Sequence, residues 1–213
     1  MQPELVLMVF TIVVLIISVI LHEVAHGYAA NWLGDPTAKL AGRLTLNPLP
    51  HIDPVGSVII PALLVITNAG FMFGWAKPVP YNPYNLRNQR WGEAFVAVAG
   101  VATNLLIAVL FAIVARVAFA QGADVFGTFA SLVCIVNLFL GLFNLIPIPP
   151  LDGFGVLRGI VPVKWGMALR DIEEKVHRGG ILSLVVILFI FMYFLSTPFY
   201  WIVSRVAGLL LGQ

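Results

Sequence analysis

The chain has 213 residues, of which 60% are hydrophobic and only 10% are charged, and its formal net charge is +2. Ordinary soluble domains carry about 25% charged residues, so this composition excludes a soluble globular protein and a disordered chain. The small net charge lacks the basic footprint of a nucleic-acid-binding protein, and the single cysteine, Cys134, cannot form an internal disulfide. Since a membrane-spanning helix needs about 20 apolar residues, the sequence predicts a polytopic membrane protein with four to six spans.

The first apolar segment covers residues 5–21, and its helical pattern continues to about residue 30. Residues 31–54 are punctuated by glycine, proline and asparagine, which favour loops. The next apolar stretch, 55–73, is itself interrupted by proline, asparagine and glycine, so a straight span is not expected there. A polar, proline-rich connection follows over 74–91.

Two long spans are predicted over residues 92–119 and 128–146. Residues 152–179 hold the largest group of charges, with apolar residues at helical spacing, which predicts an amphipathic helix on the membrane surface. Apolar segments at 181–195 and 197–212 complete the chain.

Together these segments predict the fold class: an all-α polytopic membrane protein, built as a bundle of about four to six transmembrane segments. No composition shift marks a separate soluble domain. We therefore expect one membrane-embedded domain over 1–213, with its core at 5–160 and with amphipathic and transmembrane segments over 161–213.

Ionisable residues cluster at the end of the first apolar segment, in the order His22-Glu23-Val24-Ala25-His26. Charged groups inside a membrane are costly, so such residues are functional candidates by default. On a helix, the two histidines share one face and can bind the same Zn²⁺, while Glu23 lies on an adjacent face suited to a general base. A histidine pair in a polar seam between helices is the non-catalytic alternative.

A catalytic zinc site needs three protein ligands and an open position. Asp152 is the leading candidate for the third ligand, because prolines over 147–150 break the preceding span and Gly153 lets the backbone turn back toward the bundle. His51 and Asp53 are weaker candidates in a proline-bounded loop, and turn chemistry is the favoured interpretation of both.

Three motifs in this order resemble the site-2 protease family of intramembrane zinc metalloproteases. The first is the HEVAH sequence in the first span. The others are Gly100-x-x-x-Asn104, which is weak alone, and Asn144-x-x-Pro147-x-x-x-x-Asp152-Gly153. The link at 121–127 is too short for the PDZ domain that longer members carry, so the resemblance is to a minimal form of the family.

The resemblance implies a role for each matching residue. His22, His26 and Asp152 would bind one Zn²⁺, and Glu23 would be the general base. Asn104 and Asn144 would contact the substrate backbone or the oxyanion, with interhelical hydrogen bonding as the alternative for both.

The implied function is hydrolysis of a peptide bond in or near a transmembrane segment of a membrane protein. The expected partners are a single-span substrate and the surrounding lipids, with no nucleic acid. Two alternatives stay open. Two histidines and one aspartate also suit a non-haem Fe(II) enzyme, although Glu23 has no obvious part in one. A non-catalytic scaffold or metal-binding protein could retain the fold, but it would need neither Glu23 nor an open coordination position.

One metal site requires the motif-bearing ends of three spans to lie on the same side of the membrane. Residues 31–91 must then begin and end on that side, which predicts that 55–73 is re-entrant or a broken pair of half-helices. On this threading ten of the twelve lysines and arginines lie on the side of the site. The positive-inside rule therefore predicts a cytoplasmic-facing site and an external N-terminus in a cell membrane.

Residues 71–82 end in alternating prolines, which disfavour helix and fit an extended edge strand. One edge of this segment lacks N–H donors, whereas the other could pair with an unwound substrate. An interfacial anchor is the alternative. The predicted docking residues are Gly74, Trp75, Ala76 and Lys77.

Overall fold

The computed structural model describes residues 3–67 and 74–212, and every regular element in these ranges is helical. The α-helices are α1 (Pro3–Trp32), α2 (Thr37–Leu40), α3 (Ile60–Ile66), α4 (Gln89–Ala120), α5 (Asp124–Asn144), α6 (Asp152–Ile160), α7 (Val163–Ile190) and α8 (Ser196–Leu211). Shorter turns are the 3-10 helices η1 (Leu49–His51) and η3 (Pro83–Asn85) and the π-helical turns η2 (Pro54–Ile59) and η4 (Phe191–Leu195).

Within the described ranges, four helical segments are long and apolar enough to cross a membrane: Glu4–Trp32, Trp91–Ala120, Asp124–Asn144 and Leu182–Leu211. This agrees with the predicted all-α polytopic architecture. Their faces toward the surroundings carry large apolar side chains, as expected for helices solvated by lipid.

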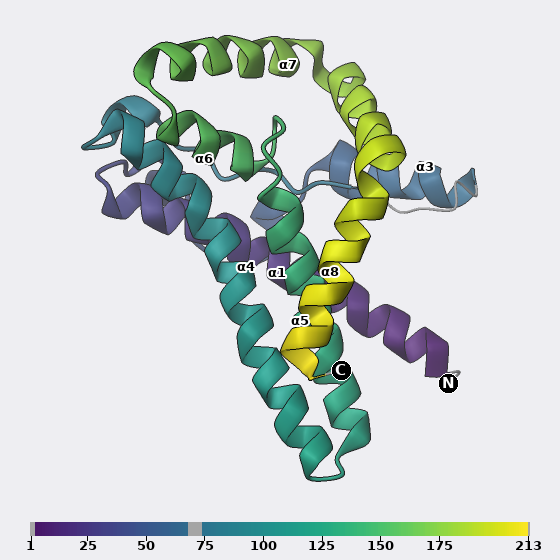
Figure 1. The fold of residues 1–213 in the computed structure, drawn as a ribbon. Helices are drawn as coiled ribbons and strands as arrows, with labels where there is room; N and C mark the ends of the chain where they lie inside the picture. Colours follow the sequence, from purple (N-terminus) through teal and green to yellow (C-terminus); the bar gives the residue numbers. More distant parts are fainter. Residues whose placement is uncertain (1–2, 68–73, 213) are drawn as a thin grey trace.

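The antiparallel pair α4 and α5 forms the centre of the bundle (Figure 1). The chain reverses between them at Gly122, whose φ of +71° suits glycine. Helices α1 and α6 pack against α4, and α8 runs along α5. The buried cluster between α4, α5 and α8 is rich in small residues, which lets the helices approach closely. Its buried members are Ala108, Ala112, Cys134, Leu138, Phe199, Val203 and Ala207.

Helix α7 consists of two helices that meet at Gly180, where φ is +53° and ψ is −133°. The part before Gly180 lies across the end of the bundle, and the part after it turns toward α8 (Figure 1). This break falls at the boundary that the charge pattern predicts. Pro198 does not interrupt the last segment, because it stands in the first turn of α8, where a missing N–H is tolerated. The separately predicted stretches 181–195 and 197–212 therefore lie in one candidate span.

The insertion between α1 and α4 contains η2 and α3, which form a short apolar helix over Pro54–Leu64 rather than a full span. This agrees with the predicted break in the segment, and its return to the same side of the membrane stays a prediction. The predicted strand is wrong for the described part of the insertion, because residues 74–82 are neither helix nor strand. The backbone N–H groups of Trp75 and Lys77 donate to Gly56 O and His51 O, and not to a neighbouring strand. Residues 68–73, which include the start of the predicted docking segment, lie outside the described residues.

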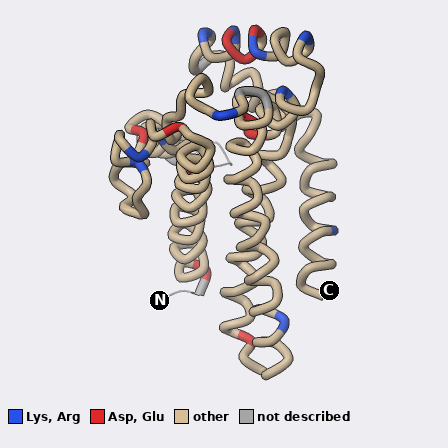
Figure 2. The backbone as a smooth tube through the Cα atoms, turned by 90° about the vertical axis from the view of Figure 1, so that its left-hand side faces the viewer, with Lys and Arg blue, Asp and Glu red and all other residues tan. Residues whose placement is uncertain are grey.

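The charges of the described residues gather at one end of the bundle (Figure 2). They lie on the first part of α7 and around the loops that join α1 to α4, while the long helices carry few. This asymmetry matches the distribution from which the orientation is predicted.

Candidate metal centre

His22 and His26 lie one turn apart near the end of α1 and are 6% and 9% exposed. Their Nε2 atoms are 3.0 Å apart, and their ring planes are nearly perpendicular. The i, i+4 spacing on a helix therefore brings both imidazoles to one point, as the sequence predicts.

Asp152 completes the group from the first residue of α6. Its Oδ2 lies 2.9 Å from His22 Nε2, and its Oδ1 lies 3.3 Å from His26 Nε2. The turn that brings it back depends on Gly153, because a Cβ there would overlap the carbonyl groups of Leu145 and Ile146. The packing therefore agrees with the prediction that the chain needs Gly153 where it turns back toward the bundle.

The donor set fits a zinc ion. The ligand atoms of these three residues all lie within 4.8 Å of one another, and tetrahedral zinc with bonds of about 2.0 Å places its ligands about 3.3 Å apart. Oδ2 of Asp152 is buried and, apart from its 2.9 Å contact with His22 Nε2, has no polar partner within the described part of the chain, so a cation between the two groups would satisfy it. Two neutral imidazoles and one carboxylate are typical zinc ligands.

Helix α4 contacts the Nδ1 atoms of both histidines, the ring nitrogens opposite those that face Asp152. His26 Nδ1 lies 2.6 Å from Val96 O, and His22 Nδ1 lies 2.6 Å from Asn104 Oδ1. Between these contacts is Gly100, where an added Cβ would stand 2.5 Å from His26 Nε2 and 2.7 Å from His22 Cε1. The Gly100-x-x-x-Asn104 element therefore provides space for the imidazoles and, one turn later, a hydrogen-bond partner.

Glu23 points to the loop that follows the insertion. Its Oε2 accepts a hydrogen bond of 2.8 Å from Val79 N, the one N–H in the Pro78-Val79-Pro80 sequence. It does not belong to the metal-ligand group, which agrees with a role beside the metal rather than on it.

The two asparagines of the predicted substrate contacts are placed differently. Asn104 is 0% exposed and faces His22, so the structure gives it an interhelical hydrogen bond. Asn144 Nδ2 donates to Leu140 O on its own helix, and its side chain is partly buried. Contact of either residue with substrate stays a prediction.

The weaker ligand candidates lie outside the group. His51 is buried and bonds Thr45 O through Nε2, while Asp53 caps η2 by accepting from Val55 N and Gly56 N. The turn interpretation of Asp53 is therefore correct.

The N–H groups on the predicted docking edge already donate hydrogen bonds within the protein. The N–H groups of Trp75, Lys77 and Val79 donate to Gly56 O, His51 O and Glu23, and the carbonyl oxygens of Trp75 and Lys77 accept from Ser57 and Arg43. The prolines at 78 and 80 fall on the alternate positions. The segment is therefore a strap held to the protein, not an unpaired edge.

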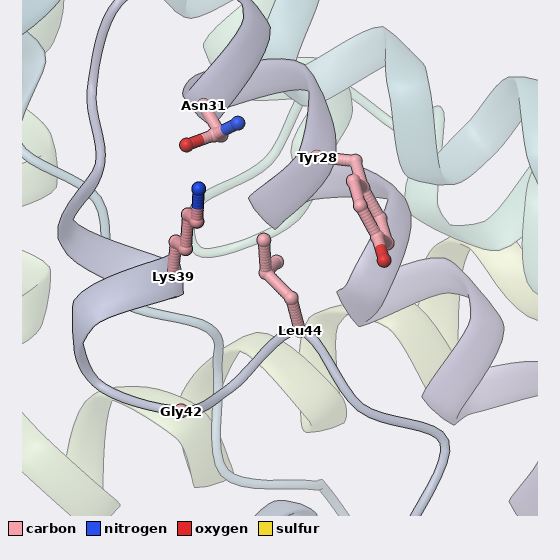
Figure 3. Close-up of a pocket in the computed structure, with 5 residues that line it drawn as sticks. All are labelled: Tyr28, Asn31, Lys39, Gly42 and Leu44. Carbon is pink, nitrogen blue, oxygen red and sulfur yellow. The ribbon is translucent and has the colours of Figure 1, made fainter.

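A pocket of about 350 Å³ lies at the end of α1, between Tyr28 and Asn31 on that helix, Lys39 on α2 and Leu44 in the loop after it (Figure 3). A second pocket of about 330 Å³ shares Tyr28 and Leu44 and continues along α1 past Ala25. The metal ligands line neither pocket, although both pockets are lined by other residues of α1.

Two features of the site were not assigned from the sequence. Asn137, one heptad before Asn144 on α5, is 0% exposed and accepts a hydrogen bond from Asn104. Glu93, at the start of α4, pairs with Arg158 on α6 and with Arg170 on α7. In the sequence, the available signal for Glu93 was a carboxylate among apolar residues. Its partners could not be identified in this way, because they are more than 60 residues away.

Comparison with known proteins is consistent with this geometry. The model of Peptidase family M50 matches residues 117–191. The chain is 40% identical over 163 residues to "Putative zinc metalloprotease YwhC" of Bacillus subtilis, covering 73% of this chain and 71% of the relative. It is 30% identical over 164 residues to Rip2 of Mycolicibacterium smegmatis, which has the same description, covering 72% of this chain and 62% of the relative. No solved structure matches the chain significantly.

The chain therefore belongs to Peptidase family M50, the site-2 protease family. The resemblance predicted from the three motifs is confirmed, and zinc is the metal of the family. The protein is a metalloprotease by family, with membrane-spanning helices.

Proposed function

We propose that this protein is an intramembrane zinc metalloendopeptidase of the site-2 type, which hydrolyses a peptide bond in or near a transmembrane segment of a membrane-protein substrate. The observation that carries the proposal is the ligand group of His22, His26 and Asp152. The two histidines are buried and stand on a helix long enough to cross the membrane, and Asp152 reaches them from the start of α6. The names of the relatives support the zinc-dependent protease chemistry. The place of the site within the bundle supports a substrate that is itself in the membrane.

The protein groups divide the chemistry between them. A bound Zn²⁺ would act as a Lewis acid on the scissile carbonyl and lower the pKa of a water ligand toward neutrality. Glu23 then accepts the proton of the attacking water and delivers it to the leaving amine. The hydrogen bond from Val79 N fixes the orientation of the Glu23 carboxylate during these transfers.

The substrate must be locally unwound, because the carbonyl of a helical peptide bond is engaged in an intrahelical hydrogen bond. A single-span membrane protein with helix-destabilising residues near the cleavage point fits this requirement. Such a substrate is the partner we propose, together with the lipids around the bundle.

The test is cleavage of single-span peptides co-reconstituted with the full-length protein in vesicles. We expect cleavage that stops when a zinc chelator is added and returns when zinc is restored. Glu23→Gln provides the matched control, since it should retain zinc and cleave the peptide far more slowly. Metal analysis of protein purified without added metal distinguishes zinc from iron. Cleavage that persists without metal, or an iron-loaded protein, would contradict the proposal.

We also propose that the N-terminus is outside the cell and that the metal centre faces the cytoplasm. The asymmetric charge distribution supports this orientation (Figure 2). Single cysteines introduced into a Cys134→Ala background test it by accessibility labelling. Cysteines at Asn47 and Asn88 should react from the cytoplasmic side only, and one at Gln2 from outside. Labelling of Asn47 and Asn88 from opposite sides would show that the insertion crosses the membrane.

A further inference from the structure

His22 and His26 are supported by partners of different kinds. His26 Nδ1 faces Val96 O at 2.6 Å, and a backbone carbonyl can only accept. The proton of His26 must therefore be on Nδ1, which leaves the Nε2 lone pair for a metal. His22 Nδ1 faces the side-chain amide of Asn104 at 2.6 Å, and an amide can present either its oxygen or its NH₂ group. His22 is in the metal-binding tautomer only if the oxygen is presented.

A chain of hydrogen bonds continues from Asn104 into the bundle. Asn104 Nδ2 donates to Asn137 Oδ1 at 2.9 Å, and the main-chain oxygen of Ser18 lies 3.4 Å from the same nitrogen. Asn137 Nδ2 in turn donates to Ser18 Oγ at 2.9 Å and to Val133 O at 3.0 Å. Asn104 and Asn137 are 0% exposed and Ser18 is 3% exposed, so water does not compete for these groups.

The two ends of this chain fix its direction. Val133 O and Ser18 O can only accept, so Asn137 must direct its NH₂ group toward Val133 and Asn104 must direct its NH₂ group toward Ser18. Reversing Asn104 would place its oxygen against Asn137 Oδ1 and Ser18 O, and buried oxygens opposed in this way are unpaired and costly. Reversal would also put an NH₂ group against His22 Nδ1 and force the His22 proton onto Nε2, where the metal binds.

We propose that Asn137, with Ser18, is a positioning residue for zinc: it locks the amide orientation of Asn104 and thereby the metal-binding tautomer of His22. His26 needs no such device, because its partner is a carbonyl. The inference rests on the proposed zinc site, and it assigns to Asn137 an effect on metal binding across two hydrogen bonds, without contact with the metal.

The experiment compares zinc affinity in full-length protein, by competition with a chromophoric chelator in detergent. Asn137→Leu removes both the acceptor for Asn104 and the donors, and we expect its zinc affinity to fall about tenfold, the low end of the effect of groups that orient a metal ligand. Asn137→Asp, protonated in this buried site, can still accept from Asn104 and donate to Ser18, so its affinity should stay close to that of the wild type. Cys134→Ala, on the same helix and 0% exposed, is the matched control for packing.

A second readout reports the tautomer directly. Nitrogen-15 spectra of histidine-labelled, zinc-depleted protein should show a proton on His22 Nδ1 in the wild type, whatever the state of Nε2 beside Asp152, and partial loss of the Nδ1 proton in Asn137→Leu. A packing defect alone would not move this proton. The wild-type spectrum requires no variant to fold, and a His22 Nδ1 that carries no proton would overturn the inference.

Equal zinc affinity of Asn137→Leu and Cys134→Ala, with the His22 Nδ1 proton retained in both, would also overturn it while leaving the proposed function intact. A wild-type protein that binds no zinc would overturn the proposed function and the inference together.

Discussion

The metal-binding end of the bundle and the C-terminal span are buried in different ways. In the candidate spans of α4 and α5, 39% of the residues in the apolar 18-residue core of each span are buried. In the span Leu182–Leu211 only 6% of such residues are buried. Around the metal centre many of the buried side chains are polar, including His22, His26 and Asn104. On α8 the buried residues are Phe199, Val203 and Ala207, all apolar.

The polar contacts around the metal centre determine which helix faces pair. In a membrane, lipid is as apolar as leucine, so hydrophobicity alone does not choose which helix faces pair. Close approach at Gly100 and buried polar contacts fix α1, α4, α5 and α6 to one geometry. Helix α8 adds apolar packing on one face only. Substitutions around the metal centre should therefore reduce zinc binding or stability strongly, and substitutions on the outer face of α8 should reduce stability only slightly.

The largest effect is expected at the ligands. His22→Ala and Asp152→Ala should lose zinc, because a site with two ligands binds the metal poorly, whereas Glu23→Gln should keep it. Peptide cleavage should fall in all three variants, by about 10²–10⁴-fold for Glu23→Gln, whose amide cannot accept a proton. Zinc content and cleavage rate are measured on the same preparations. Equal zinc content in all three variants would contradict the assignment of roles.

Gly100→Ala should separate the metal centre from the rest of the fold. The added methyl would stand 2.5 Å from His26 Nε2, so one imidazole must leave its place and zinc affinity should fall by at least about tenfold. Gly155→Ala is the matched control, since its methyl would meet only Ala97 Cβ, at 3.1 Å. If both variants bind zinc equally well, α4 does not constrain the histidines as described.

The buried ion pairs of Glu93 come next. Glu93→Leu leaves Arg158 without one carboxylate partner at a site where Glu93 has a side-chain exposure of 4%, and we expect a loss of about 3 kcal/mol in the free energy of unfolding. Glu174→Leu is the comparison, because its pair with Arg178 is exposed and should contribute less than about 0.5 kcal/mol. Unfolding in mixed micelles measures both. Similar losses for the two variants would show that burial does not set the strength of these pairs.

Asp35 fixes the loops around the metal end and should give a pH dependence. Burial alone would raise its pKa, but hydrogen bonds from Thr37, Asn85 and Asn82 N outweigh burial and lower it. The stabilisation is therefore complete above the ordinary carboxyl pKa and is lost as pH falls through the lowered pKa of the folded state. Asp35→Asn should cost about 1–2 kcal/mol at pH 7 and show a flatter acid limb in the stability curve. An unchanged acid limb would assign the pH dependence to other carboxylates.

The smallest effect is expected on the outer face of α8. Leu209 is 77% exposed, so Leu209→Ala should change the free energy of unfolding by no more than about 0.5 kcal/mol. Leu138→Ala, on α5 and 2% exposed, should cost about 2–5 kcal/mol because it opens a cavity. A large effect at Leu209 would indicate that another protein, rather than lipid, covers this face.

The spans and the three ligands could be predicted from the sequence because both depend on local spacing. Histidines four residues apart share a helix face wherever the helix lies, and a proline break followed by Gly153 indicates that Asp152 can turn back. Length and hydropathy likewise predict helices without knowledge of their neighbours. The boundary at Gly180 was visible for the same reason.

Contacts between distant segments were decided only by the tertiary structure. Proline spacing predicts an extended segment at 71–82. The sequence does not show that the N–H groups of Trp75, Lys77 and Val79, on the edge predicted to pair with substrate, bond Gly56, His51 and Glu23 instead. The link from Asn137 to His22 passes through three helices, and Glu93 meets Arg158 across α4 and α6. Hydrogen bonds and ion pairs act over a few ångströms in space, and residues far apart in the chain come within that range only when the helices have packed.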